Sequence, residues 1–106
     1  MENLDLIKIL NDCAAHCNYC ADACLDEDDP RKMIDCIRTD RACAVICTAT
    51  ANLLSTNFSD IRALINYCSD ICKKCAQECE MHDNQHCKEC AASCRECSDA
   101  CLSYLI

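Results

Sequence analysis

The spacing of the cysteines constrains this chain more than any other feature. Sixteen of the 106 residues are cysteine, and in four segments they follow one another at steps of three and four, with one step of seven. Such alternating steps return to one face of an α-helix. At about 100° per residue, the first four cysteines fall on a stripe about 60° wide. The spacing predicts four helices, each with one sulfur-lined face. The cysteines are Cys13, Cys17, Cys20, Cys24, Cys36, Cys43, Cys47, Cys68, Cys72, Cys75, Cys79, Cys87, Cys90, Cys94, Cys97 and Cys101.

Glycine is absent from the chain and proline occurs once. Hairpins, tight turns and bulges depend on glycine for positive φ, so loop-rich disulfide scaffolds do not fit. P-loop and Rossmann sites are excluded as well, because both place glycines next to phosphate. The absence of glycine and the single proline therefore favour a helical protein.

Charge and the N-terminal residues bear on partners and location. Eighteen acidic residues against ten basic ones give a net charge of −8, which excludes nucleic acid as a partner because phosphate contacts need a basic face. No apolar run approaches the roughly 18 residues of a membrane span. The N-terminus has no basic segment followed by an apolar one, as an export signal would. We therefore expect a cytoplasmic protein whose cysteines are thiols, since the cytosol is reducing.

Polar residues separate the four predicted helices. Asp29 and Pro30 are typical of an N-cap followed by a first helical residue, Asn57 or Ser59 is expected to cap the third helix, and Asp83 the fourth. Short connections make consecutive helices antiparallel. We predict an all-α, up-down-up-down antiparallel four-helix bundle with a Cys-lined core. It forms a single domain over 1–106, with helices at about 3–25, 30–54, 58–81 and 84–104.

The inward positions differ between the two ends of this bundle. Continuing the steps of three and four beyond the cysteines brings apolar residues together at one end, which we call the apolar pole. Its residues are Leu6, Leu10, Leu54, Ile61, Tyr104, Leu105 and either Leu64 or Ile65. The opposite end, which we call the sulfur pole, carries Cys24, Cys36, Cys79 and Cys87. The sequence predicts an apolar plug at one pole and a thiol-lined interior elsewhere.

Sixteen inward thiols indicate metal binding. They are too many to serve only as small hydrophobic residues. Cysteines three or four apart on one helix are poorly placed for disulfides. Iron–sulfur clusters are usually held by loop cysteines, often before proline, and no cysteine here precedes proline. Soft thiolates otherwise select Cu(I) or Zn(II).

Cu(I) fits the stripes better than zinc. Structural zinc needs closed four-ligand sites, each about −2 in charge with four thiolates, whereas Cu(I) accepts two or three thiolates. Seven cysteine pairs are four residues apart on one helix, about 6 Å between backbone positions, and each is expected to converge on one ion. Unshared pairs give about eight ions and bridging thiolates more, so we expect roughly 8–16 Cu(I) per chain. Loading should release protons.

The cysteine segments resemble those of the bacterial copper storage proteins over essentially the whole chain. The motifs are C-A-A-H-C-N-Y-C-A-D-A-C (13–24), C-S-D-I-C-K-K-C-A-Q-E-C (68–79) and C-K-E-C-A-A-S-C-R-E-C-S-D-A-C (87–101). Without an export signal, the chain resembles the cytosolic branch. The resemblance implies Cu(I) storage or sequestration, a homo-tetramer of bundles, and a mouth of Met or His residues at the open end.

Four weaker ligands gather by topology at the sulfur pole: Met33, Met81, His82 and His86. Thioether and imidazole bind Cu(I) less tightly than thiolate does, so these residues could let copper in and out. The alternative is that they are surface residues beside the loops, and this alternative is favoured for Met81 and His82.

Other polar and aromatic residues are expected to be structural. Asp40 fills the skipped cysteine step and lies within about 40° of the stripe, and we expect it to turn toward a helix interface and pair with a basic neighbour. His16 lies about 70° off its stripe and should be a flank or interface residue. The acidic run 26–29 is a solvated helix end that at most attracts cations or a copper chaperone. Tyr19, Tyr67 and Phe58 are expected to pack between helices or subunits.

Two other function classes stay open. A zinc-binding structural bundle would hold about four ions and lose its fold without them. A thiol redox sensor would need one or two privileged thiols. No nucleophile, base and orienting group can be recognised together, so we do not expect an enzyme. Storage, in contrast, predicts that the bundle folds without metal.

Overall fold

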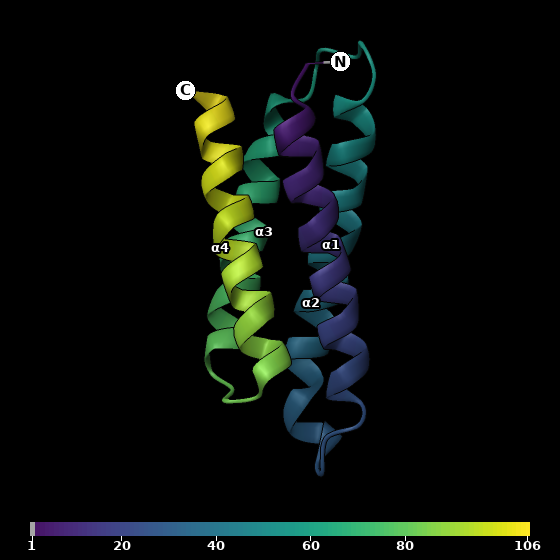
Figure 1. Ribbon diagram of the computed structural model, residues 1–106, viewed down its shortest axis with the longest axis vertical. Coiled ribbons are helices and arrows are strands. Elements are labelled where there is room, and N and C mark those ends of the chain that lie inside the picture. Colours follow the sequence, from purple (N-terminus) through teal and green to yellow (C-terminus); the bar gives the residue numbers. More distant parts are fainter. Residues whose placement is uncertain (1) are drawn as a thin grey trace.

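The computed structural model describes residues 2–106. Consecutive helices run in opposite directions, and both termini lie at the same end as the α2–α3 connection (Figure 1). Helices α1 and α3 each pack against both α2 and α4, and the bundle measures 45 × 20 × 19 Å. The predicted all-α antiparallel bundle is confirmed. Its elements are α1 (Leu4–Cys24), the 3-10 helix η1 (Pro30–Met33), α2 (Ile34–Leu54), α3 (Arg62–Glu80) and α4 (Gln85–Leu105).

The second helical region starts differently from the prediction. Asp29 does cap it, since its side chain accepts a hydrogen bond from the Arg31 N–H at 3.3 Å, and Pro30 occupies the first position, where its missing N–H costs nothing. However, the first four residues form the 3-10 helix η1, and the α-helix begins only at Ile34.

The predicted caps of the last two helices are wrong. Ile61 and Asn84 occupy the N-cap positions of α3 and α4, and neither makes a side-chain capping bond. The α2–α3 connection has its own turn, because the Phe58 N–H donates to Thr56 Oγ1 at 3.1 Å. This turn holds residues 56–58 outside the helix, so α3 begins at Arg62 rather than near residue 58.

Small residues recur at every seventh position beside the inward stripe. In α3 and α4 the row faces the partner helix, because Ser69 and Ser98 are buried with their Oγ atoms 3.0 Å apart. Without large side chains between them, helices can approach closely, which explains why α1–α2 and α3–α4 pack more extensively than the other neighbouring pairs. The row is Ala14, Ala21, Ala44, Ala51, Ser69, Ala76, Ala91 and Ser98.

The core changes composition along the bundle. All sixteen cysteines are completely buried, which confirms the predicted Cys-lined interior. At the apolar pole, Leu6, Leu10, Leu54, Ile61 and Ile65 are buried as well, so the apolar plug is present. No helix in the described part of the chain combines the length and apolar character that crossing a membrane requires.

Candidate metal centre

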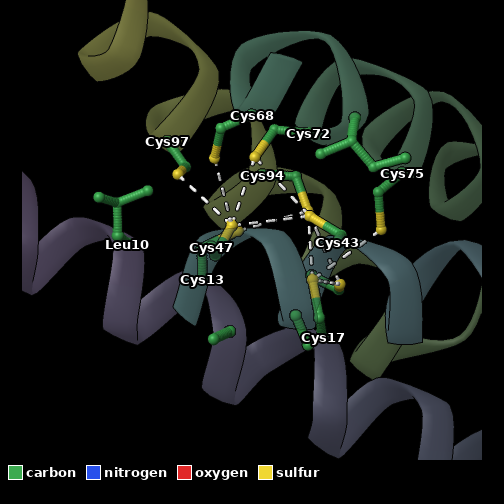
Figure 2. Close-up of a cluster of buried hydrophobic side chains, with 14 of the residues drawn as sticks. Leu10, Cys13, Cys17, Cys43, Cys47, Cys68, Cys72, Cys75, Cys94 and Cys97 are labelled. Atoms are coloured by element: carbon green, nitrogen blue, oxygen red, sulfur yellow. Dashed lines mark hydrogen bonds between the residues drawn. The ribbon is translucent and has the colours of Figure 1, made fainter. Parts of the chain in front are cut away.

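Sulfur atoms from all four helices point toward one another along the bundle axis (Figure 2). Neighbouring sulfurs are 3.6 to 4.0 Å apart, as in the pairs Cys47–Cys72 at 3.6 Å and Cys36–Cys79 at 3.7 Å. These distances are thiol contacts, since a disulfide brings its sulfurs to about 2.05 Å, and all sixteen cysteines are free. The core is therefore a column of thiols in mutual contact.

Many of the close sulfur contacts join different helices, as in Cys13–Cys94 at 3.8 Å and Cys43–Cys72 at 3.7 Å. Same-helix pairs lie close as well. The sulfurs of Cys43 and Cys47 are 3.9 Å apart and those of Cys90 and Cys94 are 4.0 Å apart, and the pairs Cys13–Cys17 and Cys20–Cys24 each have their sulfurs within 4.8 Å of each other. Side chains one turn apart on a helix stand side by side, whereas those of facing helices meet at the axis. Candidate metal sites thus combine same-helix pairs with cysteines from facing helices.

Sets of four ligand atoms within 4.8 Å of one another recur along the column. One set takes one cysteine from each helix, and neighbouring sets share members such as Cys13 and Cys17. A sulfur that belongs to two sets can bridge two ions, so the arrangement suits a polynuclear thiolate cluster better than isolated sites. Three of the sets are Cys13, Cys47, Cys72 and Cys97; Cys13, Cys17, Cys43 and Cys94; and Cys17, Cys75, Cys90 and Cys94.

Asp40 faces the core, so the expectation that it turns to a helix interface is wrong. It is completely buried. Its Oδ1 accepts hydrogen bonds from the thiols of Cys75 at 3.0 Å and Cys90 at 3.3 Å, and its Oδ2 accepts one from Cys36 at 3.6 Å. The neighbouring Arg41 is exposed. Thiol donors, rather than a cation, satisfy this carboxyl group.

Burial decides the charge of Asp40. Loss of hydration, together with the proximity of Cys90, raises the pKa of Asp40 to about 8. The carboxyl group is therefore largely protonated at neutral pH. A set of four candidate ligands includes it with Cys20, Cys79 and Cys90, which places a carboxyl oxygen among the core sulfurs.

At the sulfur pole an imidazole joins the thiols. The Nδ1 of His86 lies 3.3 Å from Cys20 Sγ and 3.5 Å from Cys87 Sγ, and these three residues form a four-ligand set with Cys24. Burial raises the pKa of the Cys87 thiol to about 12 and also raises that of Cys24. Metal binding here must displace thiol protons.

The other residues predicted at the mouth differ in burial. Met33 is buried within the core cluster. The Nε2 of the His82 ring is buried without a hydrogen-bond partner and lies 3.7 Å from a Glu78 carboxylate oxygen. The backbone N–H of His82 donates to the backbone carbonyl of Cys79. Met81 is 69% exposed. The structure thus brings Met33, His82 and His86 to the sulfur pole and leaves the Met81 side chain in solvent.

The remaining predictions concern the surface. His16 is exposed on the outer face of α1, as expected for a flank residue. Tyr19, Tyr67 and Phe58 are each more than half exposed, so they do not pack between helices of this chain. Sequence reasoning missed one contact, because Glu27 in the acidic run lies 2.8 Å from His86 Nε2, and nothing in the spacing of residues 26–29 distinguishes it from its neighbours.

An antiparallel bundle whose axis is filled with overlapping thiol ligand sets defines a protein that holds several soft metal ions in its core. The family described as copper storage protein matches residues 2–106, and the chain belongs to this family. It is 38% identical to the cysteine-rich protein YhjQ of Bacillus subtilis over 97 residues, which are 92% of this chain and 90% of the relative.

Solved structures agree with this assignment. The Cu(I)-bound copper storage protein BsCsp3 is 35% identical, with a TM-score of 0.91 and 96% of each chain covered. A cytosolic copper storage protein from Streptomyces lividans, solved with five coppers, is 42% identical, with a TM-score of 0.91 and coverage of 94% of this chain and 88% of the other. The S. lividans protein has also been solved loaded with 10 copper equivalents.

Proposed function

We propose that this protein binds and stores multiple Cu(I) ions through the thiolates of all sixteen core cysteines. The observation that carries the proposal is the overlap of the four-ligand sets, in which shared sulfurs can bridge neighbouring ions. Cu(I) accepts two or three soft ligands, and one thiolate per ion leaves a neutral core. The proposed capacity is roughly 8–16 Cu(I) per chain on ligand-number grounds. The copper-bound structures of BsCsp3 and the S. lividans protein support it.

Storage without turnover follows from the same geometry. The thiols form a column of sulfurs in mutual contact, and all sixteen are completely buried. A redox sensor would instead expose one or two reactive thiols. We therefore propose a storage protein and not an enzyme.

The sulfur pole is the proposed route for copper. His86 supplies a nitrogen beside the outermost thiols, Met33 a buried thioether, and His82 a ring nitrogen with no hydrogen-bond partner. These ligands bind Cu(I) more weakly than thiolate and so allow exchange. Met81 is the weakest candidate because its side chain is exposed. Within residues 2–106, the segments that form the apolar pole carry no histidine or methionine.

Location and partners are proposed from the relatives and the charge. The S. lividans relative is described as cytosolic, and the large number of free thiols suits a reducing compartment. The family resemblance supports a homo-tetramer, for which the exposed side chains of Tyr19, Val45 and Tyr67 are available. The acidic run 26–29 beside the sulfur pole could attract a copper chaperone with a basic surface.

An anaerobic titration tests the function. The reduced protein is titrated with Cu(I) against a chromogenic Cu(I) chelator, and free thiols are counted at each step. We expect an endpoint of about eight or more ions per chain, with thiols progressively protected. The apo protein should remain helical by circular dichroism. An endpoint of one or two Cu(I), or preferential retention of about four Zn(II) with loss of fold on chelation, would instead identify a zinc-binding structural bundle.

A further inference from the structure

Glu27 differs from the other acidic residues of the α1–η1 connection. Asp26 and Asp28 are exposed, but the Glu27 side chain is 33% exposed and crosses to the first turn of α4. There its Oε1 lies 2.8 Å from Nε2 of His86, whose side chain is only 13% exposed. The contact joins residues 59 positions apart and ties the connection to α4 beside the sulfur pole.

This contact favours one of the two tautomers of a neutral His86 ring. A neutral imidazole has one N–H donor and one acceptor nitrogen, and an ionised carboxylate can only accept. A neutral ring satisfies this contact only with its proton on Nε2, and in that tautomer the Nδ1 lone pair faces the thiols of Cys20 and Cys87. Without Glu27, nothing in the described contacts of His86 would hold Nε2 in this role.

We propose that Glu27 is the positioning residue for His86, holding the ring with Nδ1 unprotonated and aimed at the outermost thiols so that it can receive an incoming Cu(I) ion. The inference rests on the proposed uptake of copper at the sulfur pole. Histidines that bind metals commonly donate their second ring N–H to a carboxylate, and loss of that partner typically costs 10–100-fold in metal affinity or activity. The lone carboxylate contact of His86 places Glu27 in this role.

The test compares variants of the reduced full chain. Cu(I) is supplied as a complex with a chromogenic chelator, and stopped-flow absorbance follows transfer of the first two equivalents. Glu27→Ala should slow this transfer about tenfold or more. Glu27→Gln keeps an acceptor oxygen and should stay within about threefold of the native rate. The matched control is Asp28→Ala, which removes the same charge from the same connection and should also stay within about threefold.

A second measurement reports the ring itself. Long-range ¹H–¹⁵N correlation spectra of the apo protein should show the His86 proton on Nε2 alone, and Glu27→Ala should show both tautomers. In a His86→Ala background, Glu27→Ala should have no further effect on the transfer rate. All variants retain sixteen cysteines, so their final copper endpoints should equal that of the native chain, and circular dichroism of each apo variant verifies that it folds.

The outcomes separate this inference from the proposed function. If His86→Ala slows loading but Glu27→Ala does not, Glu27 has no positioning role while the sulfur pole remains the copper route. If Asp28→Ala slows loading as much as Glu27→Ala, charge attraction explains the effect and the positioning role is overturned. If His86→Ala itself loads at the native rate, the proposed route fails, and the role of Glu27 fails with it.

Discussion

The two poles of this bundle are built on the same four helices and the same spacing of inward positions, yet they are filled with different chemistry. At the apolar pole, Leu10 and Ile65 are completely buried among other aliphatic side chains. Toward the sulfur pole, the inward positions carry thiols, the carboxyl group of Asp40 and the adjacent ring of His86. The spacing produces the bundle at both poles. The residue type at the inward positions decides whether a section stabilises the fold by apolar packing or provides metal ligands.

This division has an energetic reason. Burying a leucine or isoleucine side chain contributes about 1.5–3 kcal/mol, while a thiol is a smaller apolar group. We therefore expect the apolar pole to stabilise the fold disproportionately and without metal. The thiols can then change protonation and ligation without unfolding the chain.

The largest expected effect comes from comparing two substitutions in α1, one at a leucine of the apolar pole and one at a core cysteine. Leu10 and Cys13 lie one turn apart and are both completely buried. Leu10→Ala should lower the free energy of unfolding of the apo protein by about 2–5 kcal/mol, because it leaves a cavity, while the Cu(I) endpoint stays unchanged. Cys13→Ala should cost about 1 kcal/mol or less and should lower the endpoint. Chemical denaturation and Cu(I) titration measure the two quantities. A reduced endpoint in Leu10→Ala would contradict the division.

The next effect concerns Asp40 and pH. Its pKa in the folded protein is about 8 against 3.8 for the ordinary carboxyl group. Between these values the folded chain binds one proton more than the unfolded chain, so stability is full below pH 4 and is lost as pH rises toward 8, by up to about 1.4 kcal/mol per pH unit.

Asp40→Asn should therefore flatten the stability of the apo protein between pH 5 and 8, measured by urea unfolding at several pH values. Loss of stability above about pH 9 should persist in this variant, because burial also raises the pKa of Cys24 and Cys87. An unchanged slope between pH 5 and 8 would show that Asp40 is ionised in the folded chain.

The smallest effect concerns capacity. Asp40 occupies the step at which the cysteine ladder of α2 is interrupted, and its oxygens contact the core thiols. Asp40→Cys should raise the Cu(I) endpoint by about half an ion to one ion per chain, since each ion needs one or two thiolates. Asp40→Asn is the control and should leave the endpoint at the native value. No gain in Asp40→Cys would mean that neighbouring sulfurs already saturate that position.

Much of the architecture could be predicted because it depends on local periodicity. Cysteine steps of three and four require a helical stripe, and Asp29 followed by Pro30 correctly marked the start of the second helical region. The predicted start of α3 and the predicted caps of α3 and α4 were wrong, because contacts at the helix ends, and not the periodicity, determine them. The turn at Thr56 moves the first residue of α3 to Arg62. Asn84, at the N-cap position of α4, makes no side-chain capping bond. The recurring small residues were overlooked, although a seven-residue spacing beside the cysteines is visible in the sequence.

Asp40 shows why part of the site could not be predicted. A carboxylate near an inward stripe was expected to seek a cation, because burying a charge is costly. The structure avoids that cost differently, by placing thiol donors around the group and raising its pKa. This solution depends on cysteines from other helices, which the sequence around Asp40 does not contain.

The sequence by itself determined that the chain forms four antiparallel helices with sulfur on their inward faces and aliphatic residues at one pole, because helical periodicity and short connections are local properties. Only the tertiary structure decided which sulfurs meet across the axis, that Asp40 points among them, and that Glu27 reaches His86. Such contacts depend on the rotation and relative height of neighbouring helices. Packing of all four helices sets these quantities, and no single segment specifies them.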